Sequence, residues 1–297
     1  MSRKPDLVLI NPASRRGEMW IETLTNEFFE AGISWQSTTS EKDFEQKLRK
    51  AVADGAKEIW VGGGDGTVRQ AAGILAKTGI TLGILPLGTG NNLANELGIP
   101  CDPNRMISFL MEGTEPRAID IGMFGDQAFV NVATVGMTSR IAYFLQMMDK
   151  SKAGRLVYIP AAIASVALTR RFKVKITSDG FTFSGKAVQV VFASSERHAG
   201  PVKVTPDAEL NDGHLAVYVV TAQNRAESLK YGAKLLLGTH TDLPFVENGK
   251  LNEGEIVLDH PRHFVLDGDL VKSSGEKVRV LPGGLVVLAA PVEPTVR

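Results

Sequence analysis

The chain has 297 residues, of which 43% are hydrophobic and 22% are charged. This composition is typical of a globular protein with a large core, and the length suits two domains. The 33 basic and 33 acidic residues cancel, so no global field attracts nucleic acid, and we expect no nucleic-acid partner. The single cysteine, Cys101, excludes an internal disulfide and a cysteine-based zinc site.

The apolar segments are too short to cross a membrane. The longest, residues 156–168, is interrupted by Pro160 and falls short of the ~20 residues that span a bilayer. The first apolar run, Leu7 to Ile10, is too short for the core of a signal peptide. We therefore expect a soluble, cytoplasmic protein. We also expect transient contact with a membrane surface, with the protein peripheral at the inner membrane. The sequence carries no signal of an oligomeric state.

Up to about residue 122, short apolar runs alternate with helical patterns, which is typical of a parallel sheet covered by helices. We predict strands at residues 7–10, 34–38, 59–61 and 80–85. Helices are predicted from the spacing of Trp20, Leu24 and Phe28 up to Gly32, and over residues 44–53 and 67–77. Residues 1–122 are therefore expected to form a Rossmann-like α/β nucleotide-binding domain.

From residue 119 onward, short strands separated by turn residues replace this pattern. The predicted strands are residues 173–177, 187–192, 215–220, 255–258, 278–281 and 285–290. We expect residues 123–297 to form a mostly antiparallel β-sandwich that binds lipid, with the last residues free to return to the first domain.

The most informative segment is Gly62-Gly63-Gly64-Asp65-Gly66-Thr67, which follows a predicted strand. Its glycines indicate a tight loop rather than a continued strand. A helix beginning near Thr67 would direct free N–H groups at the loop, as phosphate binding requires. The Asp65 carboxylate would repel phosphates unless a cation such as Mg²⁺, or a hydrogen-bond donor, lies between them. An ordinary glycine-rich turn is the alternative.

Two further loops follow predicted strands, Asn11 to Arg15 and Pro86 to Asn92. Since ligands of open α/β sheets bind at the carboxyl ends of the strands, we expect all three loops to converge there. Asn11, Ser14 and Asn92 could instead be simple turn or cap residues. The segment at 62–67 fits neither the Walker pattern nor the strict dinucleotide-binding motif, which weakens both of those interpretations.

At these residues the sequence resembles the diacylglycerol kinase catalytic family, the soluble bacterial lipid kinases related to diacylglycerol and sphingosine kinases. The matching segments, in chain order, are Asn11-Pro12-x-Ser14, Gly63 to Thr67, Pro86 to Asn91, Asp120, Asp212-Gly213-x-Leu215 and Asp267-Gly268-Asp269. The Gly-Gly-Asp-Gly-Thr motif is shared with NAD kinases and phosphofructokinases. The later motifs resemble the lipid kinases more closely.

The resemblance implies a kinase that uses ATP and Mg²⁺ to phosphorylate a hydroxyl of diacylglycerol or a related lipid. The residues that it places against ATP are Asn11, Pro12, Ala13, Ser14, Arg15, Thr39, Gly64, Asp65, Gly66, Thr67, Val68, Arg69, Gln70 and Thr89. It also implies a structural magnesium site formed by Asp212 and the backbone carbonyls of Glu209 and His214. A plain hairpin turn is the alternative at Asp212.

Asp267-Gly268-Asp269 corresponds to the family's Asp-Gly-Glu, whose acidic residues are associated with the catalytic base. The resemblance implies that Asp269 accepts the proton, with Asp267 as the second candidate and Asp65 as the metal-linked centre. The chain departs from the family at Gln70, at Asn92 and in the shorter acidic side chain at 269, which reduces the acidity near the proposed metal. An NAD-kinase-like enzyme and a non-catalytic nucleotide or lipid sensor therefore stay open as alternatives.

A basic segment, Arg170, Arg171, Lys173 and Lys175, follows the apolar run 156–168. These side chains could touch lipid headgroups. The interpretation favoured by the sequence is a solvated strand face beside a core helix.

Overall fold

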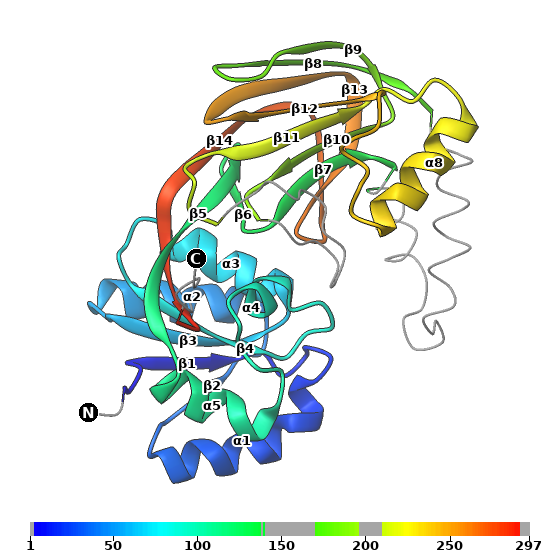
Figure 1. Ribbon diagram of the computed structural model, residues 1–297. Coiled ribbons are helices and arrows are strands. Elements are labelled where there is room, and N and C mark those ends of the chain that lie inside the picture. Colours follow the sequence, from blue (N-terminus) through cyan, green and yellow to red (C-terminus); the bar gives the residue numbers. More distant parts are fainter. Residues whose placement is uncertain (1–2, 138, 140–169, 196–209, 292–297) are drawn as a thin grey trace, which may run out of the picture. The chain divides into compact units, whose positions relative to one another are not determined.

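The computed structural model describes residues 3–137, 139, 170–195 and 210–291 (Figure 1). The chain divides into two compact units, the first comprising Met1–Ile121 with Gly283–Arg297, and the second Gly122–Pro282. The chain enters the second unit within strand β5 (Glu115–Phe124) and returns within β14 (Asp269–Ala289). Apolar run 156–168 lies outside the described residues.

The first unit is built on a parallel sheet. Its strands are β1 (Leu7–Ile10), β2 (Gln36–Ser37), β3 (Glu58–Gly63) and β4 (Thr81–Pro86). They lie in the order β4-β3-β1-β2, and the end of β14 adds to β4 in parallel, with Val286 opposite Thr81. This arrangement confirms the predicted Rossmann-like α/β domain.

Helices cover both faces of this sheet. They are α1 (Gly17–Ala31), α2 (Glu41–Ala53), α3 (Asp65–Leu75), α4 (Asn92–Glu96) and α5 (Pro103–Glu112). Figure 1 shows α1 and α5 on one face and α2 and α3 on the other. In α1, Leu24 and Phe28 are fully buried four residues apart, which is the apolar stripe that the sequence predicted. The Ser40 side chain caps α2.

The second unit is mostly antiparallel. Besides parts of β5 and β14, its elements are β6 (Gln127–Phe129), β7 (Val132–Gly136), β8 (Phe172–Ser178), β9 (Phe183–Ala187), β10 (Gln189–Ala193), β11 (Leu215–Val220), α8 (Arg225–Leu236), β12 (Val246–Leu251) and β13 (Glu253–Leu266). The strand order is β12-β11-β10-β7-β13-β14, and β8 pairs with both β13 and β9. Inward side chains such as Phe172, Phe192 and Phe264 form one core, as the predicted β-sandwich requires.

Two sequence expectations were wrong in detail. Gly62 and Gly63 belong to β3 rather than to a loop, because β3 pairs with β1 on one side and with β4 on the other up to these residues. The predicted strands at 278–281 and 285–290 are parts of the single strand β14. The irregularity at Gly283, with φ of 55°, does not end β14 because the strand gains β4 as its next neighbour.

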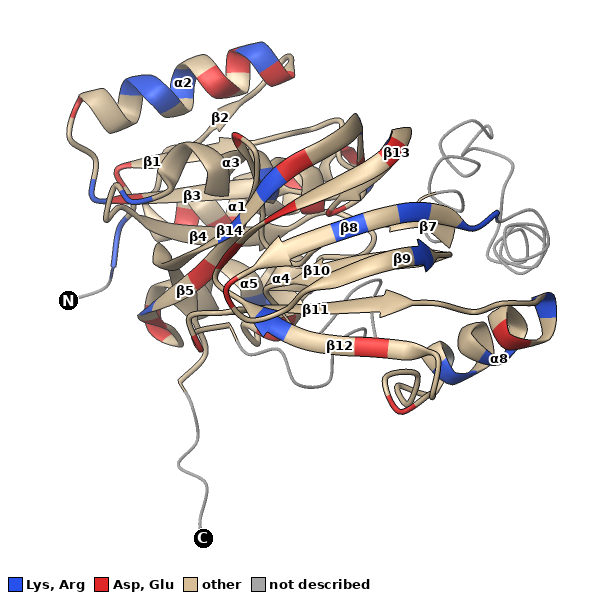
Figure 2. Cartoon of the chain, turned by 90° about the horizontal axis from the view of Figure 1, so that it is seen from above, with Lys and Arg blue, Asp and Glu red and all other residues tan. Residues whose placement is uncertain are grey.

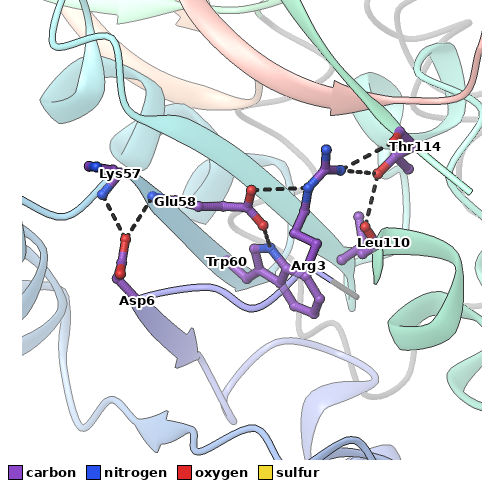
Figure 3. A network of polar contacts seen from close by, with 7 residues as sticks. All are labelled: Arg3, Asp6, Lys57, Glu58, Trp60, Leu110 and Thr114. Atoms are coloured by element: carbon purple, nitrogen blue, oxygen red, sulfur yellow. Dashed lines mark hydrogen bonds and ion pairs between the residues drawn. The ribbon is translucent and has the colours of Figure 1, made fainter. Parts of the chain in front are cut away.

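A polar network lies at the end of the parallel sheet where β3 begins (Figure 3). The glycine-rich loop follows the other end of β3. Arg3 Nε lies 3.3 Å from Glu58 Oε2, and Trp60 Nε1 donates a hydrogen bond to Glu58 Oε1 at 2.8 Å. Arg3 also donates to Thr114 Oγ1 at 3.0 Å, in the turn before β5. Burial raises the pKa of Glu58, and Arg3 and Trp60 compensate its charge.

Candidate active site

The three loops predicted to converge lie together at the carboxyl ends of β1, β3 and β4. The Asn11 backbone N–H donates to Gly62 O at 2.8 Å, and its side-chain Nδ2 donates to Thr67 Oγ1 at 3.2 Å. On the other side, the Leu87 N–H donates to Gly63 O at 2.9 Å. The Arg16 N–H donates to Leu87 O at 2.9 Å, which joins the loop after β1 to the loop after β4.

Two of these loops approach each other backbone against backbone. A Cβ atom on Gly88 would lie 2.6 Å from Gly64 Cα, a distance that no side chain can occupy. A Cβ atom on Gly63 would lie 2.5 Å from Thr67 Cβ. These two glycines are buried, and close packing of the loops requires them.

The first turn of α3 presents backbone N–H groups that could bind an anion such as phosphate. The helix begins at Asp65, and its N-cap residue, Gly64, has no side chain to cap the first N–H groups. Such N–H groups, together with the positive end of the helix dipole, attract anions. This helix start therefore suits an anion such as a phosphate group.

Asp65 has a partner that the sequence did not reveal. Its Oδ1 accepts the Asn92 N–H at 2.7 Å, and its Oδ2 accepts the Asn91 N–H at 3.0 Å. Burial raises the pKa of Asp65, while the two backbone donors oppose that rise. Backbone donors of the next loop thus compensate the charge of this carboxylate. Its role as a metal-linked centre stays a prediction.

Asn91 is a structural residue of the site that sequence reasoning did not single out. It has a φ of 50°, in the left-handed region that asparagine tolerates. Its buried side chain accepts the Gly88 N–H at 2.8 Å and donates to Gly88 O at 3.1 Å. The signal available in the sequence was an asparagine directly before a helix start, which is typical of such a cap position.

The loop after β1 combines turn residues with one outward arginine. Ser14 Oγ donates to Asn11 O at 2.8 Å, and the Ala13 N–H donates to Asn11 Oδ1 at 3.0 Å, so these side chains stabilise the turn. Pro12 lies in the same turn. Arg15 Nη1 reaches Thr89 Oγ1 at 3.4 Å and thereby brings a cation to the loop after β4.

The remaining predicted nucleotide contacts lie at α2 and α3. The Thr39 N–H donates to Asp43 Oδ2 at 2.9 Å, and Gln70 Nε2 donates to Glu41 O at 3.4 Å, so both border the first turn of α2. Val68 is 5% exposed, so it offers a ligand little surface. The other predicted residues of α3, Gly66 and Arg69, are half-buried.

Asp120 is a buried acidic residue of β5 that fixes the position of another strand. It is 2% exposed, and its Oδ1 accepts the Gly283 N–H at 2.7 Å. It therefore ties β5 to the point where β14 enters the first unit.

In the second unit, Asp267 and Gly268 form the two-residue turn between β13 and β14, where Leu266 pairs with Asp269. Their φ values of 49° and 105° match a type I′ hairpin. The Asp267 carboxylate accepts three backbone N–H groups, from Val130 at 2.6 Å, Asn131 at 2.9 Å and Val132 at 2.8 Å. Asp267 is buried, whereas Asp269 is half-buried. The two candidate bases therefore occupy very different environments.

The Asp212 carboxylate forms an ion pair with a lysine side chain. Asp212 Oδ1 accepts the His214 N–H at 3.0 Å, and Oδ2 lies 2.5 Å from Lys250 Nζ. Glu209 lies outside the described residues. Among the residues that the structure describes, no group of three or more acidic, histidine or cysteine side chains could hold a metal ion. Lys250 thus balances the charge of Asp212 within the described residues, and the magnesium site that would add the backbone carbonyls of Glu209 and His214 stays a prediction.

Comparisons with known proteins agree with this geometry. Residues 5–124 match the diacylglycerol kinase catalytic domain, and residues 131–289 match the YegS C-terminal NAD kinase beta sandwich-like domain. A Pseudomonas putida protein named probable lipid kinase YegS-like is 31% identical over 260 residues, covering 85% of this chain and 82% of the relative. A Bacillus subtilis diacylglycerol kinase is 27% identical over 268 residues, covering 88% of each chain.

The fold is shared with solved structures. The crystal structure of a diacylglycerol kinase from Bacillus anthracis superposes with a TM-score of 0.74, 22% identity and 98% coverage of both chains. The fold and the glycine-rich site define a kinase built on an α/β domain followed by a β-sandwich. The chain belongs to the diacylglycerol kinase and YegS-like kinase family. No helix in the described part of the chain is both long enough and apolar enough to cross a bilayer.

Proposed function

We propose that this protein is a lipid kinase that transfers the γ-phosphoryl group of ATP to a hydroxyl group of diacylglycerol or a related lipid, in the presence of Mg²⁺. The observation that carries the nucleotide part is the uncapped start of α3 beside the close approach of Gly64 and Gly88. The names of the relatives support the lipid part.

In this proposal the chain mainly positions the phosphates. The backbone N–H groups at the start of α3 hold the phosphate oxygens, and Arg15, linked to Thr89 across the loops, adds a positive charge. Mg²⁺ bound to the nucleotide phosphates would neutralise part of their charge. Asp65 holds the two loops at the spacing that the phosphates need.

We assign the proton-accepting role to Asp269. The lipid hydroxyl must lose its proton as its oxygen bonds to the γ-phosphorus and the bond to the leaving ADP oxygen breaks. Asp267 already accepts three backbone hydrogen bonds, which occupy both of its oxygens. Asp269, two residues later at the start of β14, is half-buried, whereas Asp267 is 6% exposed, so Asp269 is the carboxylate that a substrate hydroxyl reaches more easily.

The test is transfer of label from γ-labelled ATP to a panel of diacylglycerol, monoacylglycerol and sphingoid bases in neutral detergent micelles, with NAD as a separate acceptor. We expect a labelled lipid, and a signal reduced about 10²- to 10⁴-fold in Asp269→Asn. Labelled NADP in place of a lipid would indicate an NAD-kinase-like enzyme. Saturable ATP binding without transfer to any acceptor would indicate a sensor.

A further inference from the structure

The outer face of β8 and β9 carries a cluster of lysines that form no ion pair with any acidic side chain in the described part of the chain. Lys173, Lys175 and Lys186 are exposed, and none of them forms a side-chain ion pair within the described residues. Figure 2 shows their positive charges as blue bands on these two adjacent strands. We name these three residues the lysine cluster.

The register places two of these charges directly opposite each other. Lys173 on β8 pairs with Lys186 on β9. Like charges at opposed positions of neighbouring strands destabilise a sheet. The chain has 33 acidic residues, yet this position opposes two lysines. Binding of an anion to this face would explain why the destabilising pair is present.

Asp259 lies beside Lys173 but forms no ion pair with the lysine cluster within the described residues. Asp259 accepts the backbone N–H of Lys173 at 3.2 Å through Oδ2, and its Oδ1 contacts His260 Nδ1 at 2.9 Å and Arg262 at 3.8 Å. Both carboxylate oxygens are therefore engaged with groups other than the lysine ammonium groups.

An apolar side chain lies within the same face. Val257 on β13 pairs with Lys175 and is 46% exposed, although its neighbours along the strand, Ile256 and Leu258, are buried. A shallow groove of about 400 Å³ is lined by the lysine cluster, Val257 and Asp259, among other residues. Unpaired ammonium groups around an exposed valine match the boundary between phosphate headgroups and acyl chains.

We propose that the lysine cluster and Val257 dock this protein onto a bilayer surface rich in anionic phospholipids. The proposal rests on the proposed function in one respect, since a kinase acting on a lipid must reach a membrane. Each lysine near an anionic surface contributes roughly a fivefold gain in binding, so loss of all three predicts a decrease of about a hundredfold.

The test is co-sedimentation with vesicles of phosphatidylcholine alone or mixed with phosphatidylglycerol, without nucleotide or acceptor lipid. The variant Lys173→Gln/Lys175→Gln/Lys186→Gln should lose about a hundredfold in binding to the anionic vesicles. A matched control, Lys42→Gln/Arg49→Gln/Lys50→Gln, removes the same charge from exposed positions of α2 and should bind as the wild type does. Equal binding by both variants would overturn the proposal.

Transfer to a soluble short-chain acceptor in neutral micelles separates docking from catalysis. We expect the lysine-cluster variant to transfer phosphate as fast as the wild type in these micelles. If the wild type transfers no phosphate but still binds vesicles through these lysines, the proposed function fails and the docking proposal stands. Selective binding of an oligonucleotide in place of the vesicles would overturn the proposal.

A single substitution gives a further, independent readout. Lys186→Glu creates an opposed Lys–Glu pair, so it should raise the unfolding midpoint and lower binding to anionic vesicles. Lower stability together with unchanged vesicle binding would contradict the proposal.

Discussion

The carboxylate of Asp65 accepts a hydrogen bond from the backbone N–H of Asn92 at 2.7 Å, so the first residue of α3 holds the first residue of α4. This contact joins the glycine-rich loop after β3 to the loop after β4. It sets the spacing between the backbones of Gly64 and Gly88, beside the proposed phosphate site.

Replacing Asp65 with alanine removes the acceptor of two backbone N–H groups. A buried donor left without a partner costs about 1–3 kcal/mol, so we expect Asp65→Ala to lower the free energy of unfolding by about 2–4 kcal/mol. Urea denaturation measures this change. Glu45→Ala, which removes an exposed ion pair on α2, is the control and should change stability by less than about 1 kcal/mol.

The raised pKa of Asp65 predicts a pH dependence with a definite sign. The folded protein binds this proton more tightly than the unfolded chain does, so Asp65 makes stability fall as pH rises above its ordinary pKa of 3.8. The free energy of unfolding of the wild type minus that of Asp65→Asn should therefore decrease with pH in that range and level off above the raised pKa. A difference that grows with pH would show that the hydrogen bonds outweigh burial.

The close approach of Gly64 and Gly88 predicts unequal effects of two similar substitutions. In Gly88→Ala the new Cβ would lie 2.6 Å from Gly64 Cα, so the loops must separate, and we expect a loss of roughly 1–3 kcal/mol in stability together with weaker ATP binding. In Gly64→Ala the new Cβ would lie 3.4 Å from Gly88 Cα, an ordinary contact. Thermal unfolding of both variants should show the larger loss in Gly88→Ala, and equal losses would contradict this packing.

The two acidic residues of the β13–β14 hairpin should separate into a structural and a catalytic role. Asp267→Ala leaves three buried N–H groups without their acceptor, and we expect a loss of at least about 3 kcal/mol. Asp269→Asn should change stability by less than about 0.5 kcal/mol but reduce kcat by about 10²- to 10⁴-fold. Denaturation and steady-state kinetics on both variants test the assignment. A stable, inactive Asp267→Asn beside a fully active Asp269→Asn would reverse it.

The ion pair between Asp212 and Lys250 predicts that Mg²⁺ is not needed to stabilise that turn. Removal of divalent cations with a chelator should leave the unfolding midpoint of the wild type unchanged. In Lys250→Met the Asp212 carboxylate loses its counter-charge, and millimolar Mg²⁺ should then raise the midpoint. A chelator-induced decrease in the wild type would instead support a bound structural metal.

The sequence predicted the parts of this protein that depend on local patterns. The apolar run Leu7 to Ile10 and the spacing of Leu24 and Phe28 specify a strand and a helix through their periodicity alone. Because each glycine-bearing loop follows such a strand, their convergence at one sheet edge follows from the general topology of parallel sheets.

The contacts that were not predicted join residues far apart in the chain. Asp65 and Asn92 are separated by 27 positions, and Asp267 and Val130 by 137. No local pattern specifies which backbone N–H groups a carboxylate will accept across such distances. The assignment of Gly62 and Gly63 to a loop was wrong for the same reason, because pairing with two neighbouring strands outweighs the low strand propensity of glycine.

The most direct test of the central claim is an NMR titration of the protein with a non-hydrolysable ATP analogue and Mg²⁺. If the phosphates bind at the start of α3, the backbone amide signals of Gly64, Gly66 and Thr67 should shift most, accompanied by those of Arg15 and Thr89, and the shifts should be lost in Gly88→Ala. Saturable shifts confined to other residues, with these amides unchanged, would contradict the account.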